Sequence, residues 1–302
     1  MSARLLAALL PLLAAACLFE AEEALEFPNY VQAEAALPGN AVIKPVFNTL
    51  QNYGVAAVGD TLYHMELRHG RVHGRTGLPG EVAFLGVGDG PLFAVAGGSI
   101  CRVDGFQLTA TAELREEPAA FAVCGGSPLV VYGNGLMELI DPNDLTVIRQ
   151  GTVPGGNVVM AAGFPGIVVT ASSEGLLSAV VLDDMSLAAS DSPGGEILSL
   201  NASGDSLLLF SCSSWNELAA CSPWDLAVDI MFTFPSAPTD AAAQSDLAYV
   251  FASVPGSGVQ VCRASGEVAW RSGYADGAMV VLSEDCETAM ISRGDRIHIL
   301  VK

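Results

Sequence analysis

A repeat of about 40 residues is the sequence feature that most limits how this chain can fold. A turn that contains Pro or Gly, followed by an apolar run, recurs seven times, and the runs begin near residues 41, 81, 119, 157, 196, 239 and 278. One unit of this length cannot bury its apolar faces alone, so neighbouring units must stack. Seven such units are typical of a propeller whose blades are four-stranded sheets.

Within each unit the apolar runs have the length of strands. The unit that begins at Glu81 reads EVAFLGV, PLFAVAG, SICRVDG and FQLTATAEL, with Gly, Pro or Asp between the runs. Short runs rich in Val, Leu, Ile and Phe between such residues indicate strands, and the closely spaced turns leave no room for helices. We therefore predict an all-β chain that forms a seven-bladed β-propeller with four-stranded blades.

The two ends of the repeat predict how the ring closes. The last unit, residues 278–302, is long enough for three strands, whereas residues 27–37 precede the first unit and end in the same LPG turn as a fourth strand. We expect this N-terminal strand to complete the last blade, because closure removes the exposed sheet edges of an open array. The expected plan is a signal peptide (1–16), an acidic tether (17–26) and a single propeller domain (27–302).

One segment also resembles a known family. Residues 138–156, ELIDPNDLTVIRQGTVPGG, read as a strand, an Asp-Pro-Asn-Asp turn, a second strand and a Gly-rich link. This segment resembles the bacterial secreted WD-repeat-like propellers with YVTN-type repeats. The repeat length matches that family over residues 27–302, but only this unit also matches in its motif. It implies the propeller fold and no particular activity.

The N-terminus has the layout of an export signal. A short positive start, an apolar run over residues 5–13 and three alanines precede Cys17, and the run is too short to span a bilayer. Residues 13–17 resemble the lipobox of bacterial lipoproteins, with Ala14 where Leu is usual. The resemblance implies that Cys17 becomes a lipidated N-terminus, which predicts a periplasmic or cell-surface lipoprotein. The alternative is ordinary cleavage after Ala16 and secretion.

The charge balance restricts the partners. The chain has 13 Lys and Arg against 33 Asp and Glu, a formal net charge of −20. Such a surface repels phosphate backbones, which argues against nucleic acid as a partner. We expect the partner to be another envelope or extracellular protein, and we expect membrane contact only through the lipid anchor.

The cysteine count is odd for an exported protein. Seven cysteines become six if Cys17 carries lipid, and six can pair completely. Their places in the repeat predict one disulfide across a hairpin loop and two between neighbouring blades: Cys212–Cys221, Cys101–Cys124 and Cys262–Cys286.

Three of the four histidines lie within ten residues, interleaved with arginines. A hairpin that turns at His69 and Gly70 would place His64 opposite Arg75 and Glu66 opposite His73, all on one strand face. These residues form a candidate anion patch: His64, Arg68, Arg71, His73 and Arg75. Two alternatives are a metal site and a charged outer strand that prevents edge-to-edge pairing.

The unit that begins at Glu196 is the longest and contains two tryptophans. We expect its extra residues, CSSWNELAACSPWD at 212–225, to form a loop between its second and third strands. Exposed Trp often anchors recognition. The candidate recognition loop is Trp215, Asn216, Glu217 and Trp224. The alternative is that both tryptophans fill the gap between blades.

The chain shows no signature of an enzyme: it contains no G-x-S-x-G elbow, no P-loop and no C-x-x-C pair. The expected inner strands carry few polar side chains, and Lys44, Asn201, Asp240 and Gln244 are too scattered to predict a reaction centre. We assign no catalytic residue, cofactor or metal. The expected function is a non-enzymatic binding or scaffold module. The alternative is a propeller hydrolase or oxidoreductase, lactonase-like or quinone-dependent.

Overall fold

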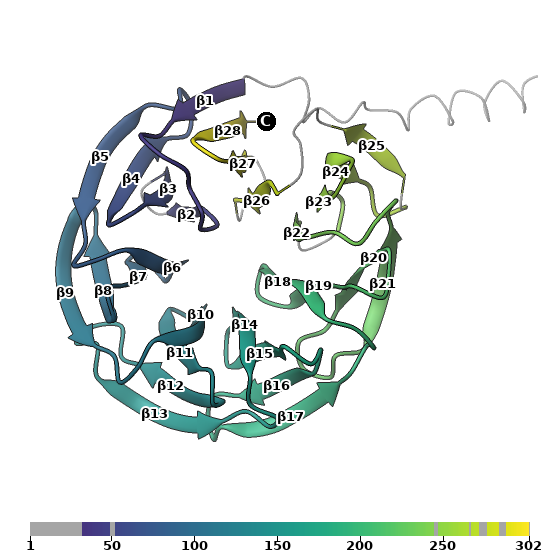
Figure 1. Cartoon of the computed structure of the whole chain (residues 1–302), viewed down its shortest axis with the longest axis horizontal. Coiled ribbons are helices and arrows are strands. Elements are labelled where there is room, and N and C mark those ends of the chain that lie inside the picture. The colour runs from purple at the N-terminus through teal and green to yellow at the C-terminus, as the bar shows by residue number, and fades with distance from the viewer. Residues whose placement is uncertain are drawn as a thin grey trace, which may run out of the picture.

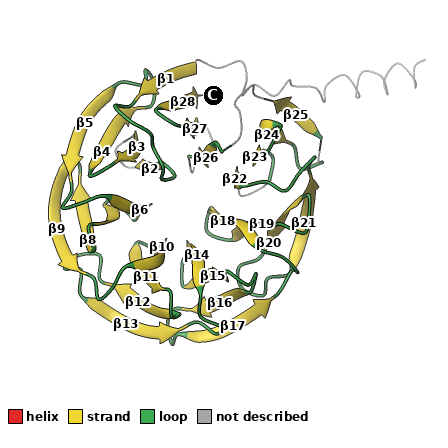
Figure 2. Ribbon diagram, viewed as in Figure 1, coloured by secondary structure: helices red, strands yellow, loops and turns green. Residues whose placement is uncertain are grey.

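The computed structural model describes residues 32–48, 52–244, 247–265, 267–271, 277–283 and 288–301. Its strands form seven four-stranded antiparallel sheets. Figure 1 shows the sheets arranged radially in a ring, with the first strand of each blade at the axis and the fourth at the perimeter. The described residues contain strands, turns and loops but no helix (Figure 2). The predicted all-β propeller with seven four-stranded blades is confirmed.

The inner strands begin close to the expected blade starts. Blade 1 contains β2 (Val46–Asn48), β3 (Tyr53–Val58), β4 (Thr61–Glu66) and β5 (Val72–Gly77). Blade 2 contains β6 (Val82–Val87), β7 (Leu92–Ala96), β8 (Ser99–Asp104) and β9 (Gln107–Glu113). Blade 3 contains β10 (Pro118–Cys124), β11 (Ser127–Tyr132), β12 (Leu136–Ile140) and β13 (Val147–Thr152). Blade 4 contains β14 (Val158–Phe164), β15 (Ile167–Ser172), β16 (Leu177–Val181) and β17 (Ser186–Asp191).

The remaining blades follow the same order. Blade 5 contains β18 (Ile197–Ser203), β19 (Leu207–Cys212), β20 (Glu217–Cys221) and β21 (Val228–Thr233). Blade 6 contains β22 (Asp240–Ala243), β23 (Val250–Val254), β24 (Gly258–Cys262) and β25 (Val268–Arg271). Blade 7 contains β26 (Met279–Leu282), β27 (Thr288–Arg293) and β28 (Arg296–Val301) and is completed by β1 (Gln32–Ala36). β1 pairs antiparallel with β28, with Glu34 opposite His298, so the predicted closure by the N-terminal strand is confirmed.

The core lies between consecutive blades rather than inside any one of them. Both faces of each sheet are covered, so second strands such as β15 and β19 are buried at every position. Val169 of blade 4, for example, belongs to one apolar cluster with Leu208 and Phe210 of blade 5. Burial on both faces explains why these strands read as continuous apolar runs instead of alternating with polar residues.

The turns between the third and fourth strands of blades 1–5, which we call the rim turns, interlock neighbouring blades. They are residues 67–71, 105–106, 141–146, 182–185 and 222–227. Asp144, Asp184 and Asp225 each accept a hydrogen bond from the backbone N–H two residues later. The residue between each aspartate and its N–H donor is apolar and has a positive φ: Leu145, Met185 and Leu226.

Each of these apolar residues packs against the preceding blade. Leu145 lies in a cluster with Ala110 and Ala112 of β9, and Leu226 lies in one with Ala189 of β17. Met185 lies against Gly151 of β13, where a Cβ would be 2.6 Å from the Met185 Cβ. The outer strands therefore carry small residues at the places where the next rim turn packs.

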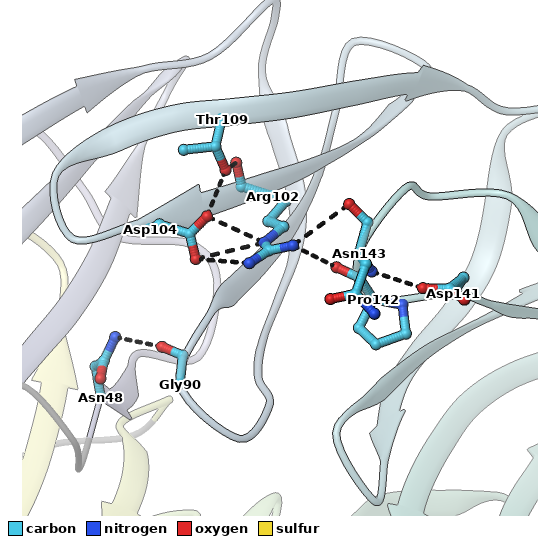
Figure 3. Close-up of polar contacts among 8 residues, drawn as sticks. All are labelled: Asn48, Gly90, Arg102, Asp104, Thr109, Asp141, Pro142 and Asn143. Atoms are coloured by element: carbon cyan, nitrogen blue, oxygen red, sulfur yellow. Dashed lines mark hydrogen bonds and ion pairs between the residues drawn. The ribbon is translucent and has the colours of Figure 1, made fainter.

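Side-chain donors reinforce this interlock. The Arg102 guanidinium of β8 donates to the carbonyl oxygens of Pro142 (3.1 Å) and Asn143 (3.3 Å) in the next rim turn (Figure 3). Asp104 lies 3.0 Å from Arg102 and accepts a hydrogen bond from Thr109, which orients both side chains. Arg149 makes the equivalent contact one blade further on, donating to the Leu182 carbonyl at 2.6 Å.

Candidate binding surfaces

The structure separates the two tryptophans that the sequence analysis placed in one recognition loop. Trp215 lies in the turn 213–216 between β19 and β20, whereas Trp224 lies in the rim turn after β20. The five residues of β20 span about 16 Å, so the two side chains lie at opposite faces of the ring. The residues 212–225 are therefore a turn, a strand and a rim turn rather than one inserted loop.

The two tryptophans also differ in exposure. Trp215 is half-buried and packs on Phe210, with ring centroids 6.1 Å apart, so it fills space between blades as the alternative reading expected. Asn216 and Glu217 anchor the end of β21: the Asn216 carbonyl accepts the Phe234 N–H, and the Glu217 carboxylate accepts the Thr233 hydroxyl. Trp224 is 49% exposed. It is followed by Asp225, a Trp-Asp pair of the kind that names the WD repeat.

The predicted anion patch does not form one face. A bulge between His64 and Met65 shifts the register, so that His64 faces Gly74 and Arg75 faces Tyr63. His64 is buried beneath Phe106 of the next blade, and the Arg75 guanidinium lies over the Tyr63 ring on the opposite face of the sheet. Both residues are therefore wrongly placed in the predicted patch.

The rest of the patch remains at the surface around the first rim turn. Arg68, His69, Arg71 and His73 are exposed. The Glu66 carboxylate bridges the two histidines, with His69 Nδ1 at 3.0 Å and His73 Nε2 at 3.3 Å. The hydrogen bond from His69 is the main cause that lowers the pKa of Glu66.

The structure contradicts the predicted hairpin disulfide. Cys212 and Cys221 are buried free thiols. Cys221 pairs with Leu208, four residues before Cys212 in β19, so the two cysteines lie about 13 Å apart along the hairpin. A disulfide needs Cα atoms within about 7 Å.

The inter-blade pair Cys101–Cys124 is also contradicted, because its two thiols are free and enter different clusters. Cys101 packs with Val55 of blade 1, and Cys124 packs with Val168 of blade 4. Burial raises the pKa of Cys101 to about 11 and that of Cys124 to about 12. Cys286 and Cys17 lie outside the described residues, so the Cys262–Cys286 pair and the lipidation of Cys17 stay predictions.

At the axis, the ring brings together three polar residues that the sequence analysis judged too scattered. Lys44 Nζ donates to Asn201 Oδ1 at 2.6 Å, to Asp240 Oδ1 at 2.7 Å and to the Ala241 carbonyl at 3.2 Å. Asp240 Oδ2 in turn accepts the Val280 N–H at 2.7 Å. Each hydrogen of the ammonium group has an acceptor, so this cluster ties blades 1, 5, 6 and 7 together. The fourth residue, Gln244, makes no hydrogen bond to it.

A second polar cluster, also missed from the sequence, ties blade 3 to the link, residues 114–117, that joins it to blade 2. The buried carboxylate of Glu138 accepts hydrogen bonds from Tyr132 (2.7 Å) and Gln150 (2.8 Å) and forms an ion pair with Arg115 at 2.9 Å. Burial and the neighbouring carboxylate raise the pKa of Tyr132. A buried charge with this many partners is a structural connection between the blade and this link.

Exposed apolar side chains concentrate on one part of the ring. Eight of the ten large apolar residues that the described surface exposes lie on the fourth strands or rim turns of blades 2–5. We call this set the apolar rim: Phe106, Leu108, Val147, Ile148, Leu187, Trp224, Val228 and Met231. Four of them, Leu108, Val147, Leu187 and Val228, occupy the same register position, directly before the extra residue of a bulge in the fourth strand.

Two kinds of feature are absent from the described residues, as follows. Within them, no helix has the length and apolar character needed to cross a membrane. The same part of the chain holds no group of three or more His, Cys, Asp or Glu side chains arranged to bind a metal ion.

Comparison with known proteins establishes the fold alone. No family model matches the chain, and no curated protein matches it significantly. The WD40 domain of Neurospora crassa Pan2 superposes with a TM-score of 0.71 at 10% identity, over 89% of this chain and 94% of that one. The computationally designed Ika8 protein superposes with a TM-score of 0.68 at 13% identity, over 90% of this chain and all of that one. The chain is thus a seven-bladed propeller whose structural neighbours include a WD40 domain.

Proposed function

We propose that this protein is a non-enzymatic binding or scaffold module that is exported and held at a membrane by lipid on Cys17. Its partner is another envelope or extracellular protein. The proposal places the chain with the bacterial secreted propellers of the YVTN type, on the resemblance of residues 138–156. The export signal and the lipobox-like residues 13–17 support the tether.

The apolar rim is the observation that carries the binding role. Trp224 and Ile148 are each about half exposed although they belong to rim turns and strands that the interlock holds rigid. Exposed apolar side chains on a fixed surface are typical of sites that bind another protein, since their burial on binding costs little ordering entropy. The surrounding turns present Asp144, Asp184 and Asp225. This combination suits a partner segment that is both apolar and basic.

The axial cluster gives less support to a hydrolase or oxidoreductase. Lys44 and Asp240 neutralise each other, and Asn201 and two backbone groups occupy their remaining hydrogen-bonding positions. A reaction centre needs ionisable groups that are available to a substrate.

Affinity capture from the native membrane fraction tests the binding role. The double variant Trp224→Ser/Ile148→Ser should lose the partner that the wild type recovers. Val42→Ser is the matched control, because Val42 is exposed but lies outside the apolar rim. Equal recovery by all three proteins would show that the apolar rim does not bind the partner.

Cell fractionation tests the tether. Cys17→Ser should move the protein from the membrane to the soluble fraction, and mass spectrometry of the wild-type N-terminal peptide should show a diacylglycerol-sized addition on Cys17. Membrane attachment that survives the substitution would contradict lipid anchoring at this residue.

A further inference from the structure

The first rim turn, residues 67–71, carries two exposed arginines, Arg68 and Arg71. Its backbone is closed by hydrogen bonds from Gly70 N to the Glu66 carbonyl (2.9 Å) and from Glu66 N to the Arg71 carbonyl (2.8 Å). Gly70 has φ +65° and lies against β1, where a Cβ would be 2.8 Å from the Glu34 carbonyl carbon and oxygen. The turn is therefore fixed on the outer strand of blade 7, with Arg68 and Arg71 exposed.

Two carboxylates beside this turn, on β4 and β1, already have cationic or imidazole partners. Glu66 is bonded to His69 and His73, and Glu34 forms an ion pair with Arg296 and lies 3.7 Å from His298. Within the described residues, neither Arg68 nor Arg71 forms an ion pair. Five other cationic side chains each form an ion pair with a carboxylate: Lys44, Arg102, Arg115, Arg149 and Arg296.

Arg68 and Arg71 lie three residues apart on one fixed turn, and within the described residues both are exposed without an ion-pair partner in a chain of net charge −20. A guanidinium group presents a planar fork of donors that fits phosphate oxygens, and two such groups on one rigid turn can converge on one anion or on two neighbouring ones.

The position of the turn suggests which anion it meets. β1 begins at Gln32, only two residues before the Glu34 backbone that Gly70 contacts. The 15 residues from Cys17 to Val31 reach at most roughly 50 Å at about 3.3 Å per residue. A lipid on Cys17 would thus keep the start of β1, and the turn beside it, within roughly 50 Å of the bilayer, where the turn can reach the headgroups.

We propose that Arg68 and Arg71 form a phosphate-binding site for the headgroups of anionic phospholipids, at the point where the tethered ring meets the membrane. This inference rests on the proposed tether and adds a second membrane contact to it. The acidic remainder of the surface is repelled by an anionic bilayer, so the contact also orients the ring with blades 7 and 1 toward the membrane.

Vesicle co-sedimentation tests the site independently of the lipid. The full chain carrying Cys17→Ser is mixed with vesicles of phosphatidylcholine alone or with one third phosphatidylglycerol. Binding is expected only to the anionic vesicles and should weaken as salt rises. Arg68→Gln/Arg71→Gln should lower the affinity roughly 25-fold, at about fivefold for each cationic side chain near an anionic surface.

The control variant Arg75→Gln/Arg293→Gln removes two charges from β5 and β27, outside the turn, and should weaken binding much less than Arg68→Gln/Arg71→Gln. Equal binding by the two double variants, or no binding to anionic vesicles, would overturn the proposal. Inorganic phosphate distinguishes a lipid headgroup from free phosphate as the ligand. If phosphate shifts the NMR signals of Arg68 and Arg71 but anionic vesicles do not bind, the site takes free phosphate and the lipid assignment is wrong. Because the assay lacks the lipid anchor, its failure leaves the fractionation test of Cys17 unaffected.

Discussion

His64 shows how one buried residue responds to the packing of the next blade. The Thr76 hydroxyl donates to the Phe106 carbonyl at 2.9 Å, so the His64 Nε2–H must donate to that hydroxyl, at 3.0 Å. The ring is 2% exposed and lies edge-on to Phe106, with centroids 4.8 Å apart. Burial lowers the pKa of His64 to about 4, because the charged imidazolium would lose its hydration.

This depressed pKa predicts a pH-dependent stability. In the unfolded chain His64 binds its proton near pH 6.5, so its contribution is complete above that pH and is lost as the pH falls toward 4. The loss is at most about 3 kcal/mol, at about 1.4 kcal/mol per unit of pKa. Urea unfolding at pH 7 and pH 4.5 should show that the stability difference between wild type and His64→Gln shrinks or reverses at the lower pH. The exposed His73→Gln serves as control, and a difference independent of pH would contradict the burial of a neutral His64.

The rim turns and the outer strands of the preceding blades fit together as pairs of structural elements. Gly151→Val should destabilise the protein by about 1–3 kcal/mol, because the new side chain overlaps Met185 and must displace a rim turn. Gly77→Val is the matched control: Gly77 also lies on an outer strand, but a Cβ there meets no atom within 4 Å. Thermal melting should therefore separate the two variants. Equal melting temperatures would show that the interlock adds nothing to stability.

The pairing of strands within each blade explains which sequence predictions failed. The period and the apolar runs predicted the blades, because burial between blades demands both. The face of a hairpin depends instead on register, and one bulged residue transfers all later side chains to the other face. The bulge opposite His64, whose extra residue is His73 of β5, moved Arg75 across the sheet, and bulges recur in the fourth strands of blades 2–6. The axial cluster was missed for another reason: Lys44 and Asp240 are 196 residues apart and meet only because the ring closes.

Closure of the ring by β1 is a property of the whole molecule, and the contacts of blade 7 and of the first rim turn depend on it. β1 contributes Ala33 and Ala35 to a cluster that also contains Ile297 and Ile299 of β28. Without β1, the backbone edge of β28 and this apolar cluster would be exposed, and the first rim turn would lose the strand on which Gly70 rests. An exposed edge of this kind recruits other chains into intermolecular sheets.

Deleting residues 1–37 should therefore yield an aggregating protein with a lower melting temperature, as measured by light scattering and calorimetry. A rearranged chain makes the test specific: residues 32–37, moved to follow Lys302 through a four-residue Gly/Ser linker, would form an ordinary third-to-fourth strand hairpin with β28. Because β28 and β1 are antiparallel neighbours, a linker about as long as the other rim turns spans the gap. The rearranged chain should regain solubility and parental melting, since the same contacts close the same blade. If the deletion melted like the parent, or if the rearranged chain aggregated as strongly as the deletion, ring closure through β1 would not be what stabilises the molecule.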